Sequence, residues 1–364
     1  MADIPTIGVE EEFLLVDPAS GAPLPRNREV AEHAAELGVD LQLELTSCQI
    51  ETATHVAHTA DDLRGALVRL RSTVADAADR TGARLLAVGL PPTLPHDFPI
   101  TDTPRYRDIG DRFGMIAHEQ GICGCHVHVA VPNRDAAVAV SNRLRPWLPP
   151  LLALTANSAI YRNADTGHSS WRSVLWARWP SAGPPPRFDS AADYDAAVRM
   201  LVESEVIRDD GMVYWDVRPS ANFPTVEIRV ADVPATVAET VLFAVLARAA
   251  VMTALAEEER GEVQPTLDAW TLKAAYWKAA RDGLDGTGVD LRDNTAVPMT
   301  TLLQALIDWV GPALQVAGDE DVAHRELAAV IERGNGAMRQ RRAWQRRHDM
   351  REVIAVAADA TLEF

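Results

Sequence analysis

Three short segments of the sequence alternate apolar with ionisable residues, and this alternation is the strongest constraint on the fold. Their ionisable residues come in pairs two positions apart: Glu10 with Glu12, His126 with His128, and Glu227 with Arg229. Side chains at positions i and i+2 of a β-strand point to the same face of a sheet. Valine, isoleucine and cysteine fill the opposite face of the second and third segments. The pattern therefore predicts a sheet with one apolar face, packed under helices, and one face that carries carboxylates, imidazoles and guanidinium groups.

Other segments of the chain extend this sheet or cover it. Strand-like patterns occur at residues 6–16, 41–45, 49–51, 85–90, 123–131, 213–217 and 225–230. Helical periodicity predicts helices over residues 27–38, 61–82, 134–160 and 191–204, and the chain after residue 230 is expected to be helical. Short strands with helices inserted between them indicate the α+β class, with one mainly antiparallel sheet and helices on one face. We expect residues 1–364 to form a single domain.

The charge balance excludes several classes of partner. The 364 residues carry a formal net charge of −17 at pH 7, and Lys273 and Lys278 are the only lysines. A nucleic acid or an anionic membrane would need a positive surface, so neither is expected as a partner. The sequence also lacks a phosphate-binding loop that ends in Gly-Lys-Ser or Gly-Lys-Thr. Arginine and metal ions must therefore carry the charge of any bound phosphate.

The cysteines and the apolar segments indicate the compartment. Cys48, Cys123 and Cys125 are too few for a disulfide framework, which fits a reducing environment. The first residues show no basic region followed by an apolar one, so a secretion signal is not expected. The most apolar segment, residues 237–256, carries Arg248 at its middle and is predicted to be a buried helix. We expect a cytoplasmic protein.

The predicted polar face gathers acids with little positive charge, and Glu44 from the segment 41–45 joins them. Carboxylates so close together would raise one another's pKa unless a cation neutralised them. Oxygen ligands with one imidazole suit Mg²⁺ or Mn²⁺ better than Zn²⁺. Glu51 lies seven residues after Glu44, so both can share the face only if residues 46–47 form a bulge or turn. Glu11 falls on the apolar side and is expected to be an edge or supporting residue.

Several of these residues also have a purely structural explanation. Glu10 and Glu12 could protect an edge strand from aggregation, and the two histidines could be core or surface residues with satisfied ring nitrogens. A zinc site is disfavoured because Cys123 and Cys125 alternate to the face opposite the histidines. The arginines between residues 339 and 347 are typical of a solvated helix face. After the Gly-Asn-Gly at 334–336, they could alternatively form a lid over a nucleotide.

Ordered motifs along nearly the whole chain resemble those of one enzyme family. They are GVEEEF (8–13), PRY (104–106), QIE (49–51), CGCHVHV (123–129), NS (157–158), DTG (165–167), WARWP (176–180), DVRP (216–219), TVEIR (225–229) and RDGLDG (281–286). Together they resemble the carboxylate–amine ligases, the group of type-2 glutamate–cysteine ligases, which is related in fold to glutamine synthetase. Each motif alone is weak, but their order and coverage are specific.

The resemblance implies a funnel-shaped antiparallel sheet that binds ATP with two or three Mg²⁺ ions, with Mn²⁺ as an alternative. The residues that match metal-site positions are Glu10, Glu12, Glu44, Glu51, His126 and Glu227. Arg229 and Arg218 match catalytic arginines on the phosphate side, and we assign His128 with Arg229 to nucleotide binding. Candidates for gripping a substrate carboxylate are Arg105, Tyr106 and Arg162. Trp171, Trp176 and Trp179 could line a substrate pocket with Tyr106, or they could be packing residues. A homodimer is expected by resemblance alone.

The implied reaction transfers the γ-phosphate of ATP to a substrate carboxylate, and an amine then attacks the acyl phosphate. Glutamate and cysteine, which would give γ-glutamylcysteine, are the default substrates. The alternatives are a ligase of the same class with another acid and amine, a metal-dependent amide hydrolase that uses the same acids, and a binding protein without activity. We also expect Glu227→Gln to abolish turnover and to leave stability without Mg²⁺ unchanged or raised, because it would relieve repulsion.

Overall fold

A seven-stranded antiparallel sheet forms the centre of the described chain. The computed structural model describes residues 4–93, 98–119, 121–264 and 266–364. The strands lie in the order β2-β3-β1-β5-β9-β8, and β4 also pairs with β1. Their bounds are β1 Ile7–Val16, β2 Gln42–Leu43, β3 Gln49–Ala53, β4 Arg84–Leu86, β5 Gly124–Ala130, β8 Val217–Pro219 and β9 Thr225–Asp232. The predicted α+β class with one large antiparallel sheet is confirmed, and the single domain stays a prediction.

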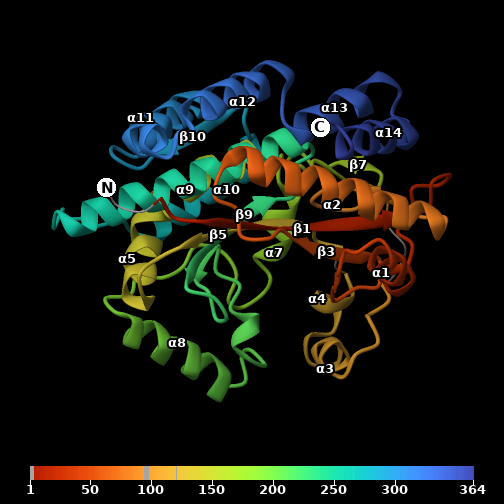
Figure 1. Ribbon diagram of the computed structural model, residues 1–364, viewed down its shortest axis with the longest axis horizontal. Helices are drawn as coiled ribbons and strands as arrows, with labels where there is room; N and C mark the ends of the chain where they lie inside the picture. Colours follow the sequence, from red (N-terminus) through yellow and green to blue (C-terminus); the bar gives the residue numbers. More distant parts are fainter. Residues whose placement is uncertain (1–3, 94–97, 120, 265) are drawn as a thin grey trace.

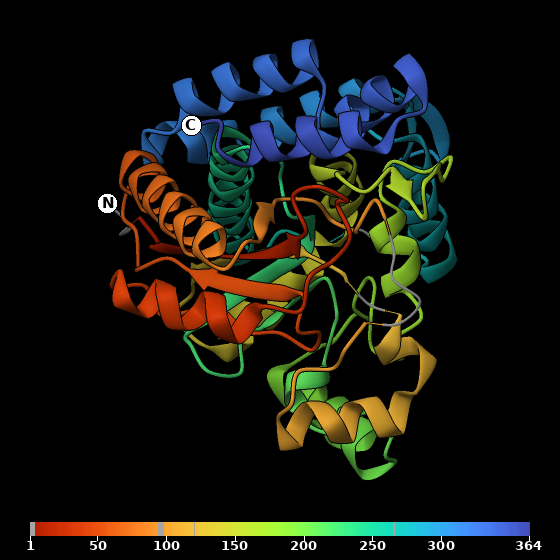
Figure 2. The ribbon, with the colours of Figure 1, turned by 90° about the vertical axis from the view of Figure 1, so that its right-hand side faces the viewer.

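Helices cover the two faces of the sheet unequally (Figure 1). Above the sheet in this view lie α2 (Ala60–Arg80), α9 (Val237–Glu259), α11 (Met299–Ala317), α12 (Glu320–Arg333), α13 (Gly336–Arg347) and α14 (Met350–Thr361). Below it, α3 (Pro104–Phe113) and α4 (Met115–His118) lie on one side and α8 (Ala191–Glu203) on the other. Figure 2, turned by 90°, again shows the C-terminal helices on one side of the sheet and α3 and α8 on the other. The main helical layer therefore covers one face, as predicted.

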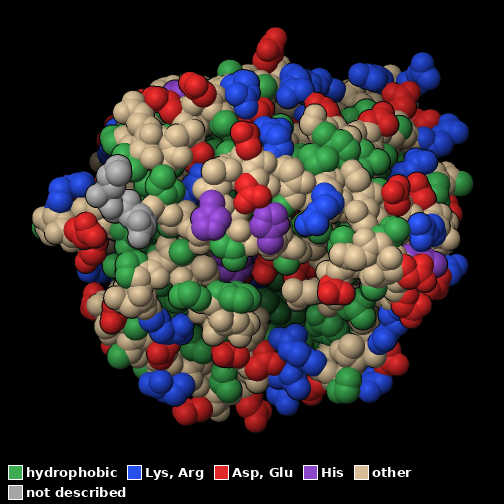
Figure 3. All heavy atoms as spheres, in the orientation of Figure 1, with side chains coloured by type: hydrophobic (Ala, Val, Ile, Leu, Met, Phe, Trp, Pro, Cys, Tyr) green, Lys and Arg blue, Asp and Glu red, His purple; other side chains and the backbone are tan. Residues whose placement is uncertain are grey.

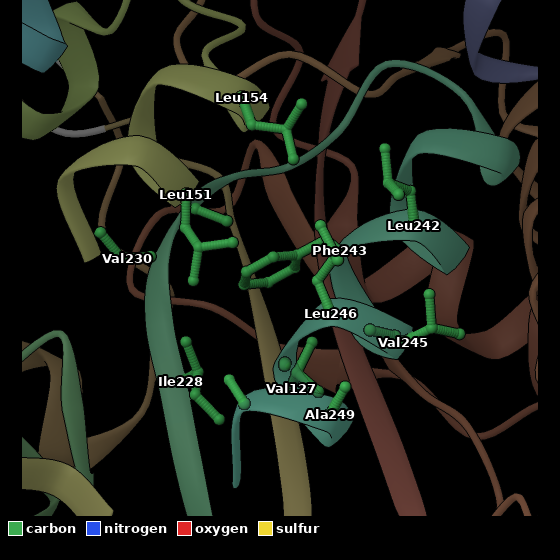
Figure 4. Close-up of a cluster of buried hydrophobic side chains, with 14 of the residues drawn as sticks. Val127, Leu151, Leu154, Ile228, Val230, Leu242, Phe243, Val245, Leu246 and Ala249 are labelled. Atoms are coloured by element: carbon green, nitrogen blue, oxygen red, sulfur yellow. The ribbon is translucent and has the colours of Figure 1, made fainter. Parts of the chain in front are cut away.

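The largest core lies between the sheet and α9 (Figure 4). Val127 of β5 and Ile228 of β9 point from the sheet towards Phe243 and Leu246 of α9, and all four side chains are buried. Burying each of them stabilises the fold by about 1.5–3 kcal/mol. Helix α9 is long and apolar enough to cross a membrane, but 83% of its most apolar window is buried inside the protein. The prediction of a buried core helix is therefore confirmed.

Side-chain caps explain why several helices begin where the sequence predicts. Thr59 accepts a hydrogen bond from the backbone N–H of Asp62 at the start of α2, and Thr236 accepts one from Glu239 at the start of α9. Asn133 caps α5 (Arg134–Leu144) in the same way. Such caps satisfy backbone N–H groups that have no partner within the helix, and each is worth about 1 kcal/mol.

Other elements differ from the prediction or were not foreseen. The predicted strands 41–45 and 85–90 shorten to β2 and β4. In place of the predicted strand 213–217, β8 begins at residue 217, after a 3-10 turn at residues 210–212. The helical region 134–160 breaks at Arg145–Trp147, continues as α6 (Leu148–Thr155) and ends before a small hairpin. The remaining elements are α1 (Asn27–Glu36), β6 (Ile160–Tyr161), β7 (Ala164–Asp165), α7 (Trp171–Trp176), α10 (Ala269–Asp282), β10 (Thr287–Asp290) and β11 (Thr295–Pro298). The hairpin β10–β11 corrects the expectation that the chain after residue 230 is entirely helical apart from its Gly-Asn-Gly interruption.

The Gly-Asn-Gly at residues 334–336 is a packed junction. Asn335 is 1% exposed, caps α13 and donates hydrogen bonds to the carbonyl oxygens of Ala153 and Leu154. A Cβ atom at Gly336 would lie 1.9 Å from Asn157 Oδ1, so only glycine fits there. Helix α13 lies above the sheet in Figure 1, on the side opposite α3 and α8. These observations contradict the lid hypothesis.

The arginines of α13 divide into anchored and solvated residues. Arg339 pairs with Glu239, and Arg341 donates to Ser169 Oγ at 3.1 Å. Arg346 and Arg347 are exposed. The solvated helix face is therefore confirmed for the last turn, whereas the first turns hold α13 against its neighbours.

Candidate active site

The register of β1, β5 and β9 brings the paired residues of the three strands together. Glu10 lies opposite His126 across β1 and β5, and His128 lies opposite Glu227 across β5 and β9. The residues between them, such as Val127 and Ile228, face the core. The same-face prediction made from the alternation is therefore confirmed for all three strands.

Glu51 and Glu44 reach this face through a turn between β2 and β3. Strand β2 ends at Leu43, and Ser47 and Cys48 form the turn before β3 begins at Gln49. The turn places Glu51 directly opposite Glu12 in the pairing of β3 with β1. A turn between the two acids is confirmed, one residue later than predicted, and it explains how two acids seven positions apart share one site.

These side chains line a cavity of about 250 Å³, which we call the catalytic cavity. Figure 3 shows this side of the molecule hollowed near its centre, with acidic and histidine side chains at the hollow. The predicted site residues that line the cavity are Glu10, Glu12, Glu44, Glu51, Arg105, Tyr106, His126, His128, Arg218, Glu227 and Arg229. Arg162 is not among them: its side chain is 57% exposed and pairs with Glu119 at 3.3 Å.

The histidines contact the acids directly. His126 Nδ1 lies 3.1 Å from Glu10 Oε2, and His128 Nδ1 lies 3.0 Å from Thr225 Oγ1. His128 Nε2 is buried without a hydrogen-bond partner among the described residues, although Glu10 Oε1 is 3.4 Å away. An unsatisfied buried nitrogen that faces carboxylates is a suitable ligand for a cation.

The acids divide into two electrostatic groups. Burial, followed by the charge of Glu12, raises the pKa of Glu44 to about 8, and burial with the charges of Glu44 and Glu10 raises the pKa of Glu51 well above its usual value. Burial also acts on Glu10, but its hydrogen bond with His126 and the nearby ring of His128 outweigh burial and lower the pKa of Glu10. Without a cation, Glu44 therefore holds a proton at neutral pH, and the same neighbours favour the protonated form of Glu51.

The other end of the cavity is neutralised by arginine. Arg218 Nε donates to Glu227 Oε2 at 2.7 Å, and Arg229 donates to Glu227 Oε1. Burial alone would raise the pKa of Glu227, but the charges of Arg229 and Arg218 lower it well below its usual range. Arg229 is 9% exposed, and its Nε is buried without a partner among the described residues, so one N–H remains available for a ligand.

The donor atoms form three groups that fit divalent cations. Within each group the ligand atoms lie within 4.8 Å of one another, and the groups are Glu10–His128–Glu227, Glu12–Glu44–Glu51 and Glu10–Glu51–His126. The first two share no residue, so two ions could be held at once. Carboxylate oxygens with one imidazole match the ligand preference of Mg²⁺ and Mn²⁺. His128, which we assigned to the nucleotide, is equally well placed as a ligand.

Aromatic side chains form one wall of the cavity. The Trp176 and Tyr214 rings lie 4.7 Å apart, and Trp179 packs on Tyr214 at 5.5 Å. Trp176 and Trp179 line the cavity as predicted, whereas Trp171 does not and packs against His168 instead. Tyr214 carried no signal beyond its place in a strand-like segment. Arg105 pairs with Asp209 at 3.0 Å, and the Tyr106 hydroxyl donates to Leu43 O at 2.8 Å. Both candidate substrate residues are thus fixed by neighbours at the cavity edge.

One important residue beneath the site gave no signal in the sequence. Arg71 of α2 is fully buried and donates to both oxygens of Glu11, at 2.5 and 3.0 Å. Thr240 of α9 donates to Glu11 Oε1 at 2.6 Å. This pair joins α2 and α9 to β1 directly behind Glu10 and Glu12. Glu11 is therefore a supporting residue, as expected from its position on the apolar side of the alternating strand.

The sequence from residue 6 to residue 359 matches Glutamate-cysteine ligase family 2 (GCS2). The chain belongs to glutamate–cysteine ligase family 2. A protein of Mycolicibacterium vanbaalenii with the provisional name glutamate–cysteine ligase 2-2 is 70% identical over 363 residues, which cover 100% of both chains. A glutamate–cysteine ligase 2-1, also provisionally named, from Nocardia farcinica is 60% identical over 99% of this chain and 94% of its own. The family resemblance predicted from the motifs is confirmed.

Solved structures share the fold of this family 2 member at low sequence identity. The glutamate–cysteine ligase of Francisella tularensis in complex with AMP superposes with a TM-score of 0.70 at 13% identity, over 98% of this chain and 88% of that one. A bifunctional glutathione synthetase from Pasteurella multocida gives a TM-score of 0.70 at 15% identity, over 98% of this chain and 52% of that one. These matches show the fold alone; the predicted funnel shape of the sheet stays a prediction.

Membership in glutamate–cysteine ligase family 2 identifies the class of reaction. The protein is an ATP-dependent carboxylate–amine ligase of the glutamate–cysteine ligase type, and it acts on small-molecule acids and amines. The predicted ligase class is therefore confirmed, and the hydrolase alternative has no support from the comparisons.

Proposed function

We propose that the protein joins the γ-carboxylate of glutamate to the amine of cysteine, with ATP and Mg²⁺, through a γ-glutamyl phosphate. The observation that carries this proposal is the catalytic cavity, which five glutamates, two histidines and three arginines line together. A set of acids so large and so close is unfavourable without cations, and cation-bound phosphates are the ligands that such a set suits.

The two ends of the cavity support different roles. Glu12, Glu44 and Glu51 would hold one divalent cation, and Glu10 and Glu227 with His128 would hold a second. Bound cations would neutralise the phosphate oxygens of ATP and so lower the barrier to phosphoryl transfer. Mn²⁺ has the same ligand preference and should substitute for Mg²⁺.

The arginines supply the positive charge that lysine supplies in other phosphate sites. Arg229 keeps an N–H without a partner among the described residues, and this N–H would donate to the γ-phosphate. Arg218 holds Glu227 from the opposite side and would assist in stabilising the charge that develops during transfer. Both side chains are fixed by existing hydrogen bonds, so little reorganisation is needed when the phosphate enters.

The chemistry proceeds in two steps. A glutamate carboxylate oxygen attacks the γ-phosphorus, ADP leaves, and an acyl phosphate forms. The cysteine amine then attacks the acyl carbon, phosphate leaves with the former carboxylate oxygen, and an amide remains. Arg105 and Tyr106, at the cavity edge, are candidates for orienting the glutamate. Arg162 would need to leave Glu119 and move to take part.

The localisation and assembly are parts of the same proposal. Cys48, Cys123 and Cys125 are buried free thiols, which agrees with a reducing, cytoplasmic setting. A homodimer remains an expectation from resemblance.

The decisive experiment is a substrate matrix with the purified protein. ATP and Mg²⁺ are incubated with pairs of acids (glutamate, aspartate) and amines (cysteine, alanine, glycine, methylamine), and ADP and product mass are followed. We expect ADP only when glutamate and cysteine are both present, with one dipeptide formed per ADP. Another productive pair would show a ligase with other substrates, and amide cleavage without ATP would show a hydrolase.

An isotope experiment tests the intermediate. Glutamate labelled with ¹⁸O in its γ-carboxylate should transfer one ¹⁸O atom to the released phosphate. Unlabelled phosphate would contradict the acyl phosphate. Glu12→Gln should lose turnover, and Glu332→Gln, an exposed glutamate on α12, is the matched control.

A further inference from the structure

A second cavity lies among the helices away from the catalytic cavity. It has a volume of about 570 Å³, and we call it the outer cavity. The 3-10 turn Arg145–Trp147, the C-terminal end of α9, the β10–β11 hairpin and α11 contribute its walls. No described residue lines both cavities. A volume of this size is within the range of pockets that bind small organic molecules.

Arg145 is the unusual residue of the outer cavity. It is 6% exposed, and its Nε is buried without a hydrogen-bond partner among the described residues. No acid of the described chain forms an ion pair with it; the nearby groups that act on its charge are Tyr276 and a second cation, Arg187. Burial lowers the pKa of Arg145, as expected for a guanidinium without a carboxylate.

The other arginines of the same cavity are paired. Arg143 contacts Glu257 at 3.2 Å and Glu258 at 2.9 Å, and Arg292 contacts Asp290 at 2.6 Å. The acids of the cavity lining are therefore already neutralised by these arginines. A buried cation without a counterion is destabilising, so proteins rarely keep one without a partner. The lining thus has one uncompensated positive charge among its described residues.

The rest of the lining is largely apolar and well fixed. The rings of Trp147 and Trp309 stack with their centres 4.9 Å apart and an angle of 17° between planes. Trp309 Nε1 donates to Glu257 Oε1 at 2.6 Å, which holds the ring in place. Leu267 and Leu302 complete the apolar surface. An inorganic anion alone would satisfy Arg145 but would leave this surface in contact with water.

We propose that the outer cavity binds a small organic oxyanion, whose carboxylate, phosphate or sulfonate group pairs with Arg145 while its apolar body packs against Trp147 and Leu302. The site is separate from the site of ligation, so its ligand does not compete with the ligase substrates for the same residues. The oxyanion of the ligand would act as the counterion of Arg145, because no described acid of the chain pairs with it.

Titration with 8-anilinonaphthalene-1-sulfonate tests the proposal, because this fluorescent probe joins one sulfonate to an aromatic body. We expect saturable binding to the full chain, and Arg145→Met should weaken it by about 10-fold or more, since a hydrogen bond to a charged group is worth about 1.5–3 kcal/mol. Arg145→Lys, which keeps the charge, should retain part of the affinity. The neutral analogue N-phenyl-1-naphthylamine should bind wild type and Arg145→Met equally.

Two controls separate the outer cavity from other sites and from misfolding. Arg346→Met removes an exposed arginine of α13 and should leave the probe affinity unchanged. Ala305→Phe fills the cavity from α11 without touching the charge and should abolish binding of both probes there. Arg145→Met should keep or raise the thermal midpoint of the ligand-free protein, because a buried unpaired charge is removed.

Three results would overturn the proposal. They are an unchanged affinity of the sulfonate probe in Arg145→Met, no saturable binding to wild type, and a large fall in the thermal midpoint of Arg145→Met. The last result would show that Arg145 has a partner within the protein.

Discussion

The carboxyl group of Glu44 makes the stability of the metal-free protein depend on pH. Burial and the charge of Glu12 raise its pKa from 4.5 to about 8. Between these two values the folded protein binds a proton at Glu44 that the unfolded chain does not bind. The free energy of unfolding therefore falls as the pH rises through this window, and it levels off above pH 8.

The size of this effect follows from the same two values. At about 1.4 kcal/mol for each pH unit crossed, the window from 4.5 to about 8 corresponds to at most about 5 kcal/mol. Glu44 is only half-buried, so contact with water reduces the effect, and we expect about 2–3 kcal/mol. The side chain of the variant Glu44→Gln cannot ionise, so the variant should lose this part of the pH dependence of the free energy of unfolding. At pH 8 it should be more stable than wild type by the same amount.

Urea denaturation at pH 5, 6, 7 and 8 in the presence of EDTA measures the effect. Other groups also titrate in this range. Burial, followed by the charge of Arg229, lowers the pKa of His126, and this lowered pKa makes the free energy of unfolding rise with pH. The comparison of wild type with Glu44→Gln isolates Glu44, and Glu332→Gln controls for the loss of an exposed acid. Added Mg²⁺ should stabilise wild type at pH 8 more than Glu44→Gln. Equal pH slopes in wild type and Glu44→Gln would refute the reasoning.

Three further variants test the roles of buried charges. Glu227→Gln should abolish turnover. Against the expectation from the sequence, it should also lower the free energy of unfolding without metal by about 3–5 kcal/mol, because Arg218 and Arg229 lose their shared carboxylate. Urea unfolding in EDTA measures this loss, and unchanged stability would contradict the pairing. Arg71→Met should lower the free energy of unfolding by about 3–5 kcal/mol, because it leaves Glu11 buried and unpaired. The double variant with Glu11→Leu should recover part of this loss, as measured by urea unfolding. Arg229→Lys should reduce kcat about 100- to 1,000-fold with little change in fold by circular dichroism; full activity would exclude Arg229 from the phosphate.

The opposite expectations for Glu44→Gln and Glu227→Gln show where sequence reasoning is insufficient. Both residues were predicted on an acidic face, and repulsion was expected for each. The structure pairs Glu227 with two arginines, one from its own strand and one from β8, whereas Glu44 faces other acids. Such neighbours depend on strand order and register, which involve contacts between distant residues.

The lid hypothesis was wrong for the same physical reason. A Gly-Asn-Gly followed by arginines is compatible with a hinge or with a packed junction, and the local sequence does not distinguish them. Contacts of residues 335 and 336 with Ala153, Leu154 and Asn157, nearly two hundred residues earlier, fix the junction. Arg162 was likewise proposed from a motif as a substrate-binding residue. In the structure it pairs with Glu119 and does not line the catalytic cavity.

The sequence by itself determined which side chains share a face of each strand, because the two-residue period of a β-strand is a local property of the backbone. It also determined the family, the ligase chemistry and the candidate ligands Glu10, Glu12, His126 and Glu227. Only the tertiary structure decided that Glu51 lies opposite Glu12 and that His128 forms a possible ligand group with Glu10 and Glu227. It also decided that Arg145 is buried with no counterion among the described residues. These features arise where segments distant in sequence meet, and their energies depend on which charges burial brings together.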